Sequence, residues 1–60
     1  MRIIETHIVR VIENRISYLA KVYVYVDEYY NRNYIMENPN GTMVKIDSHK
    51  FHYDLLDNEI

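Results

Sequence analysis

Four potential metal ligands lie within eight residues near the C-terminus. His49 and His52 are flanked by Asp47 and Asp54, and imidazole nitrogens and carboxylate oxygens bind zinc and other divalent ions. If residues 50–56 form a strand, however, His52 and Asp54 share one face while His49 lies back in the preceding turn. The spacing makes His49 and His52 weak metal candidates, and solvated surface histidines are the simpler interpretation.

Nucleophilic catalysis needs a nucleophile, a base and an orienting group within reach of one another. The chain has no cysteine, and its serines are Ser17 and Ser48. Neither lies in a Gly-x-Ser-x-Gly turn, and Ser48 and His49 would point to opposite faces of a strand. The single glycine cannot build a phosphate-binding loop. We therefore expect no enzymatic activity and no cofactor.

Basic residues concentrate in the first part of the chain. Residues 1–25 carry four cations against two carboxylates, whereas residues 26–60 carry three cations against seven carboxylates. Arg10, Arg15 and Lys21 could form a basic side on which tyrosines stack against bases. The net charge of −2 weakens this interpretation, because phosphate neutralisation supplies much of nucleic-acid affinity. Nucleic acid is accordingly the alternative partner and not the first.

Two strands are expected in the first half of the chain. Valine alternates with other residues in the run KVYVYVD, which predicts a strand over residues 17–27. Branched side chains are frequent from residue 3 onward and favour another strand over residues 3–12. Glu13-Asn14-Arg15 would connect the two, with Asn14 as the pivot because asparagine tolerates left-handed backbone.

The sequence Glu37-Asn38-Pro39-Asn40-Gly41-Thr42 predicts a hairpin within residues 34–46. Pro39 and Asn40 suit the centre of a type I turn, and Gly41 can adopt the left-handed conformation of a G1 bulge. We infer a register with Glu37 opposite Thr42. One face would then carry Ile35, Val44 and Ile46, and the other Tyr34, Met36, Met43 and Lys45.

Tyrosine and methionine side chains are expected to gather on one face of the sheet. The aliphatic positions of the strand over 17–27 predict its core face, so Tyr23 and Tyr25 point outward. The predicted partner-binding residues are Tyr23, Tyr25, Tyr34, Met36 and Met43. Both residue types are enriched at protein–protein interfaces, although packing in the core is the alternative role for each tyrosine.

The architecture that combines these elements is mainly β: a small antiparallel meander or an SH3-like barrel of four to five short strands. Phe51, Tyr53 and Leu55 alternate, which predicts a last short strand over residues 50–56. The alternative is a helix over residues 3–19 packed on a hairpin, because isoleucines recur there at helical spacing.

The 60 residues allow one small domain and leave little room for a substrate cleft. No signal peptide or apolar run long enough to span a membrane is visible, so we expect a complete, cytoplasmic protein without membrane contact. The first function hypothesis is a stoichiometric binding module, an inhibitor or adaptor of a larger protein, of the kind that viruses and phages encode. A structural homo-oligomer, such as a homodimer, is a further alternative.

Overall fold

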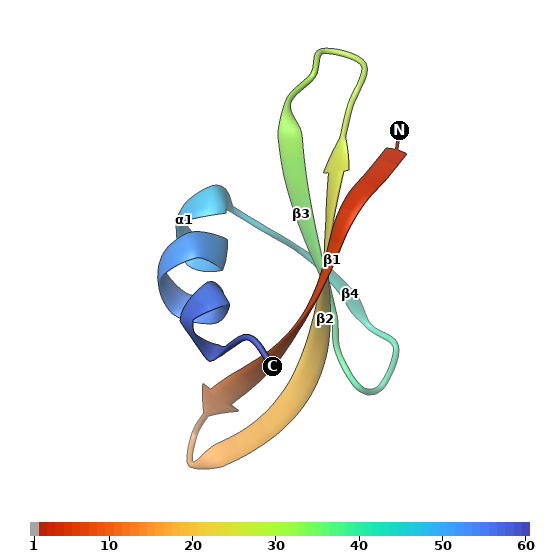
Figure 1. Cartoon of the computed structure of the whole chain (residues 1–60). Helices are drawn as coiled ribbons and strands as arrows, with labels where there is room; N and C mark the ends of the chain where they lie inside the picture. The colour runs from red at the N-terminus through yellow and green to blue at the C-terminus, as the bar shows by residue number, and fades with distance from the viewer. Residues whose placement is uncertain (1) are drawn as a thin grey trace.

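An open, four-stranded antiparallel sheet with a helical segment against one face makes up the computed structural model, which describes residues 2–60 (Figure 1). The strands follow one another across the sheet as β1 (Arg2–Glu13), β2 (Ile16–Val26), β3 (Arg32–Glu37) and β4 (Met43–Ile46). They are followed by α1 (Ser48–Lys50), η1 (Phe51–Leu55) and η2 (Leu56–Asn58). The predicted antiparallel meander is confirmed, but the sheet is not closed into a barrel, and β1 replaces the alternative N-terminal helix.

The long β1–β2 hairpin forms as the sequence predicts. Asn14 and Arg15 make a two-residue turn in which both have positive φ, 48° and 66°, and this left-handed geometry matches the twist of the flanking strands. The pairing continues from Glu13 opposite Ile16 to Arg2 opposite Val26, with a bulge between Ile3 and Glu5. Asn14 is the pivot that the sequence indicated.

The β3–β4 hairpin has the predicted turn but not the predicted register. Asn38 accepts a hydrogen bond from Gly41, whose φ is 88°, and also donates to the carbonyl of Thr42. A type I turn with a G1 bulge therefore pairs Asn38 with Thr42, and Glu37 opposes Met43. The register inferred from the sequence is wrong by one residue, and a slip of one residue exchanges the two faces of a strand.

The C-terminal segment is helical, so the short strand predicted over residues 50–56 is wrong. Asp47 caps this segment by accepting a hydrogen bond from the backbone nitrogen of Lys50 at 2.7 Å. Phe51 and Leu55 lie four residues apart and are both buried, whereas Tyr53 between them is exposed. The helical spacing of four residues between Phe51 and Leu55 thus describes this segment, and the alternation at every second residue that suggested a strand does not.

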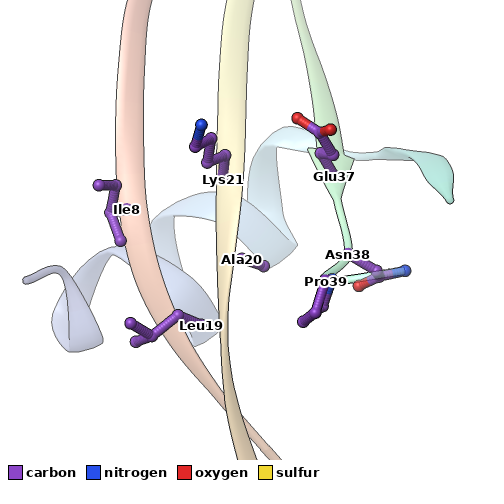
Figure 2. A pocket seen from close by; sticks show the side chains of 7 residues that line it. All are labelled: Ile8, Leu19, Ala20, Lys21, Glu37, Asn38 and Pro39. Carbon is purple, nitrogen blue, oxygen red and sulfur yellow. The ribbon is translucent and has the colours of Figure 1, made fainter. Parts of the chain in front are cut away.

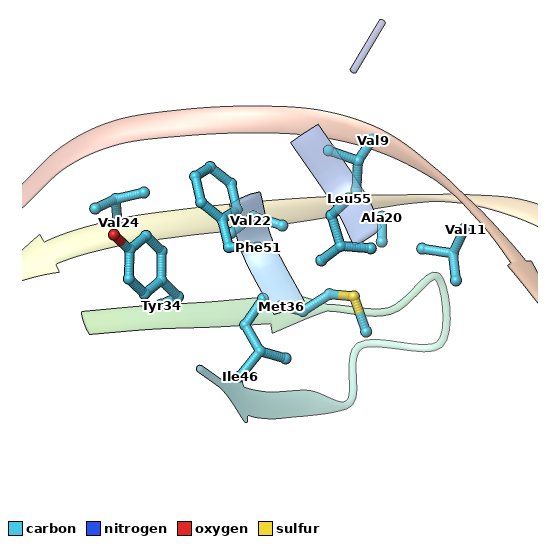
Figure 3. Close-up of a cluster of buried hydrophobic side chains, with 10 residues drawn as sticks. All are labelled: Val9, Val11, Ala20, Val22, Val24, Tyr34, Met36, Ile46, Phe51 and Leu55. Atoms are coloured by element: carbon cyan, nitrogen blue, oxygen red, sulfur yellow. The ribbon is translucent and has the colours of Figure 1, made fainter. Parts of the chain in front are cut away.

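The core fills the space between the helical segment and the face of the sheet that this segment covers, which we call the inner face (Figure 3). Its buried side chains are Val9, Val11, Ala20, Val22, Val24, Tyr34, Met36, Ile46, Phe51 and Leu55. Within residues 2–60, no helix is long and apolar enough to cross a membrane.

Candidate functional site: the outer face of the sheet

The face of the sheet opposite the helical segment, here the outer face, carries a second set of apolar side chains. Residues directly opposite in adjacent strands project from the same face, so the register groups its members into cross-strand rows. The outer face consists of Ile3, Thr6, Ile8, Arg10, Ile12, Ser17, Leu19, Lys21, Tyr23, Tyr25, Asn33, Ile35, Glu37, Met43 and Lys45. In the part of the chain that the structure describes, no element packs over this face.

Three of the five predicted partner-binding residues lie on the outer face. Tyr23 and Tyr25 are half-buried there, and Met43 is exposed beside Glu37. Tyr34 and Met36 instead point into the core and are only 4% and 6% exposed, so the prediction that they face outward is wrong. The cause is the one-residue slip in the hairpin register, which places Tyr34 opposite Ile46.

A carboxylate fixes Tyr23 near the centre of the outer face. The hydroxyl of Tyr23 donates a hydrogen bond to Glu37 Oε1 at 2.5 Å. This bond and the neighbouring negative charge raise the pKa of Tyr23, so its hydroxyl stays protonated. The bond therefore ties Tyr23 of β2 to Glu37 of β3, the adjacent strand.

A shallow hollow of about 340 Å³ lies beside this pair. Figure 2 shows that its lining comes from β1, β2, the end of β3 and the start of the β3–β4 loop: Ile8, Leu19, Lys21, Glu37 and Pro39 contribute to it. The hollow offers an apolar floor with one cation and one carboxylate at its rim. An apolar side chain of a partner could insert there.

The exposure of aliphatic residues on the outer face was not predicted from the sequence. Ile8, Ile12 and Leu19 are exposed on it, and Ile35 is half-buried between Tyr23 and Lys45. The signal was present, because the run from Ile8 to Ile12 is apolar on both of its alternating faces. Such a run is typical of a strand that buries both faces, yet β1 lies at the edge of an open sheet.

Cations outnumber carboxylates on the outer face. Arg10, Lys21 and Lys45 face outward with a single carboxylate, Glu37, so this face has a formal charge of +2. Since the whole chain has a charge of −2, the remainder carries −4. Arg10 and Lys21 thus share the face with the tyrosines, as the nucleic-acid alternative requires, whereas Arg15 lies apart in the β1–β2 turn.

The weak metal candidates contact different aromatic neighbours. The ring of His49 lies 4.7 Å from that of Tyr53, whereas the ring of His52 lies 6.0 Å from that of Tyr34. Among residues 2–60, no group of three or more histidine, cysteine, aspartate or glutamate side chains is arranged to hold a metal ion.

A charged cluster at the margin of the inner face was also missed. His7 Nε2 lies 2.8 Å from Glu5 Oε1, and His7 Nδ1 lies 2.5 Å from Glu59 Oε2. Arg32 donates to the second oxygen of Glu5 at 2.6 Å. These bonds raise the pKa of His7, mainly through Glu5, and lower the pKa of Glu5, mainly through His7 and then Arg32.

Comparison with known proteins adds no family to this description: no family model, curated protein or solved structure matches the chain.

Proposed function

We propose that this protein is a stoichiometric binding module that docks its outer face on a larger protein and occludes part of the partner's surface. The uncovered apolar face carries the proposal, because Ile8, Ile12 and Leu19 are exposed together on the side opposite the helical segment. Large contiguous apolar patches on soluble proteins commonly mark binding sites. An inhibitor or adaptor that acts by occlusion needs such a face and no catalytic cleft.

The charges of the outer face define the chemistry of the partner. Arg10, Lys21 and Lys45 surround the apolar side chains, and only Glu37 opposes them. The complementary surface is an amphipathic segment whose apolar residues are flanked by carboxylates. Its apolar side chains would cover Leu19 and the adjacent hollow, and its carboxylates would pair with the three cations.

A second copy of this chain is a poorer occupant. Two outer faces in contact would bring two surfaces of charge +2 together, and like charges across an interface oppose association. Nucleic acid is also disfavoured, since Glu37 lies among the cations and holds the hydroxyl of Tyr23. Ile8, Leu19 and Met43 moreover offer no aromatic surface for bases. A cytoplasmic protein, such as a host target of a viral or phage inhibitor, is the partner class that fits this proposal.

A matched pair of variants tests the proposal. Ile12 and Ile16 are 65% and 64% exposed, but Ile12 belongs to the outer face and Ile16 projects from the opposite side near the hairpin turn. Ile12→Glu and Leu19→Glu should each abolish capture of partners that the wild-type protein retrieves from a lysate. Ile16→Glu, which makes the same chemical change, should capture them as the wild type does.

Four results would contradict the proposal. Capture that is equal for all variants, or no capture by the wild type, would remove the outer face as a protein-binding site. A dimer in light scattering that Leu19→Glu dissociates would make a second copy the occupant. Salt-sensitive binding of oligonucleotides that is lost in Lys21→Glu would favour the nucleic-acid alternative.

A further inference from the structure

The free edge of β1 is the longest unpaired backbone edge of the sheet. β1 contains 12 residues and pairs with β2 along almost its whole length. Its other side meets a single bridge, between Val9 and Glu59, in the part of the chain that the structure describes. The edge of a sheet presents unpaired N–H and C=O groups and is a template for another extended chain.

The chain's own C-terminal residues show how such an edge can be recognised. Glu59 pairs with Val9 in the antiparallel sense, and the backbone nitrogen of Ile60 donates to the carbonyl of Ile8 at 2.8 Å. The Glu59 carboxylate reaches His7. A backbone hydrogen bond and a side-chain contact together are the combination by which sheet edges bind extended peptides.

Both contacts of His7 can be hydrogen bonds to ionised carboxylates only when the imidazole is protonated and charged. Each ring nitrogen faces a carboxylate oxygen, Nε2 that of Glu5 and Nδ1 that of Glu59. An ionised carboxylate only accepts hydrogen bonds, so both nitrogens must carry protons. His7 therefore offers its Nδ1–H to a carboxylate that lies beside the free edge of β1, whether that carboxylate belongs to Glu59 or to another chain.

The other groups around His7 come from three elements. Arg32 of β3 contacts Glu5 and leaves the Nδ1 side free for Glu59. Val22 of β2 lies opposite His7. In the helical segment the uncharged ring of Phe51 lies 5.2 Å from the imidazole, and the ring of His52 lies beyond it, 5.1 Å from Phe51.

Glu59 and Ile60 are held only weakly against the edge of β1. The Glu59 side chain is 39% exposed and Ile60 is 68% exposed, so they bury little apolar surface. Few contacts and exposed hydrogen bonds are typical of segments that open locally at small cost in free energy. Another chain with the same recognition groups could therefore replace them.

We propose that the free edge of β1 is a second binding site, which accepts an extended peptide carrying a carboxylate residue followed by an apolar residue. The peptide adds as an antiparallel strand at Ile8–Arg10, and its carboxylate takes the place of Glu59 on His7. Glu59 and Ile60 act as the internal competitor. This site uses the backbone edge of β1, whereas binding to the outer face uses side chains.

The experiment titrates the full chain with a synthetic peptide that has the sequence of Leu56–Ile60, Leu-Asp-Asn-Glu-Ile. Binding of the peptide is measured by NMR. Glu59→Gln should bind this peptide several-fold more tightly than the wild type, because the internal competitor loses its charge. In the Glu59→Gln background, where no charged competitor offsets the loss, adding His7→Gln should weaken binding on the order of tenfold, the scale of one charge-assisted hydrogen bond. A peptide with glutamine in place of glutamate should lose affinity for the Glu59→Gln protein by a similar factor.

Controls separate recognition from folding. His49→Gln removes an exposed imidazole from the helical segment and should leave binding unchanged, and circular dichroism should show that His7→Gln remains folded. The peptide should shift the backbone amides of Ile8 and Arg10. No binding at millimolar peptide, shifts confined to β4, or equal affinity of the Glu59→Gln protein with and without His7→Gln would overturn the proposal.

Discussion

Tyr34 and Phe51 stack with their ring centroids 4.8 Å apart and their planes inclined by 26°. Tyr34 belongs to β3 and Phe51 to η1, so this contact joins the sheet to the helical segment. It exists because the hairpin register turns Tyr34 to the inner face. Offset stacking of aromatic rings adds to the stabilisation that burial provides.

Replacement of Tyr34 should therefore cost far more stability than replacement of a tyrosine on the outer face. We expect Tyr34→Ala to lower the free energy of unfolding by about 3 kcal/mol, since it leaves a cavity beside Phe51. Tyr25→Ala on the outer face should cost about 1 kcal/mol or less. Urea denaturation of both variants measures the difference, and equal losses would contradict the observed register.

Stability should depend on pH through His7 and Glu5. The pKa of His7 is raised above its ordinary value of 6.5, so its contribution is complete below that value and disappears as the pH rises through the folded-state pKa. The pKa of Glu5 is lowered from 4.5, so its contribution is complete above that value and disappears as the pH falls through the folded-state pKa. The cluster is thus most stabilising between these two values.

His7→Gln should abolish the decrease in stability that the wild type shows as the pH rises through the folded-state pKa of His7. At pH 6 the variant should be less stable than the wild type by about 1 kcal/mol, a value reduced for the partial exposure of the carboxylates. The difference should shrink as the pH rises. Thermal unfolding of both proteins from pH 4 to 9 measures it, with His49→Gln as the matched control. A difference that does not change with pH would show that the imidazole charge is not involved.

The sequence was sufficient for the features that depend on neighbouring residues. Alternation in the run around Val24 predicted β2, and the preferences of Asn14 and Gly41 predicted two turns. The turn was predicted correctly, but the assignment of faces was wrong. The loop leaves out only Pro39–Gly41, so Asn38 already pairs with Thr42, and this difference of one residue exchanges the face of Tyr34 with that of Ile35.

The features that the sequence did not reveal depend on distant residues. Phe51 and Leu55 match a strand and a helix almost equally well, and only the inner face of the sheet selects the helix. Likewise His7 and Glu59 are separated by 52 positions, so their contact requires the C-terminal segment to return to β1. Neither arrangement follows from local spacing.

The cap of the helical segment offers a further test of the C-terminal structure. Asp47 accepts a hydrogen bond from the Lys50 backbone nitrogen at 2.7 Å, which a strand over the same residues would not need. Asp47→Ala should lower the free energy of unfolding by about 1 kcal/mol, as measured by chemical denaturation. Asp47→Asn retains an accepting oxygen and should restore most of the loss. Equal stability of Asp47→Ala and the wild type would contradict this capping role.

The β1–β2 turn contains a strained residue whose replacement should increase stability. Arg15 has φ of 66°, a conformation that is unfavourable for residues with a Cβ atom but easily adopted by glycine. Arg15→Gly would create Asn-Gly, the preferred pair for this two-residue turn. We expect a gain of about 0.5 kcal/mol, because the relief of strain exceeds the added entropy of the unfolded chain. Chemical denaturation of Arg15→Gly and Arg15→Ala distinguishes this cause from loss of the charge: only the glycine variant should gain, and a gain in both would place the effect in the side chain and not in the backbone.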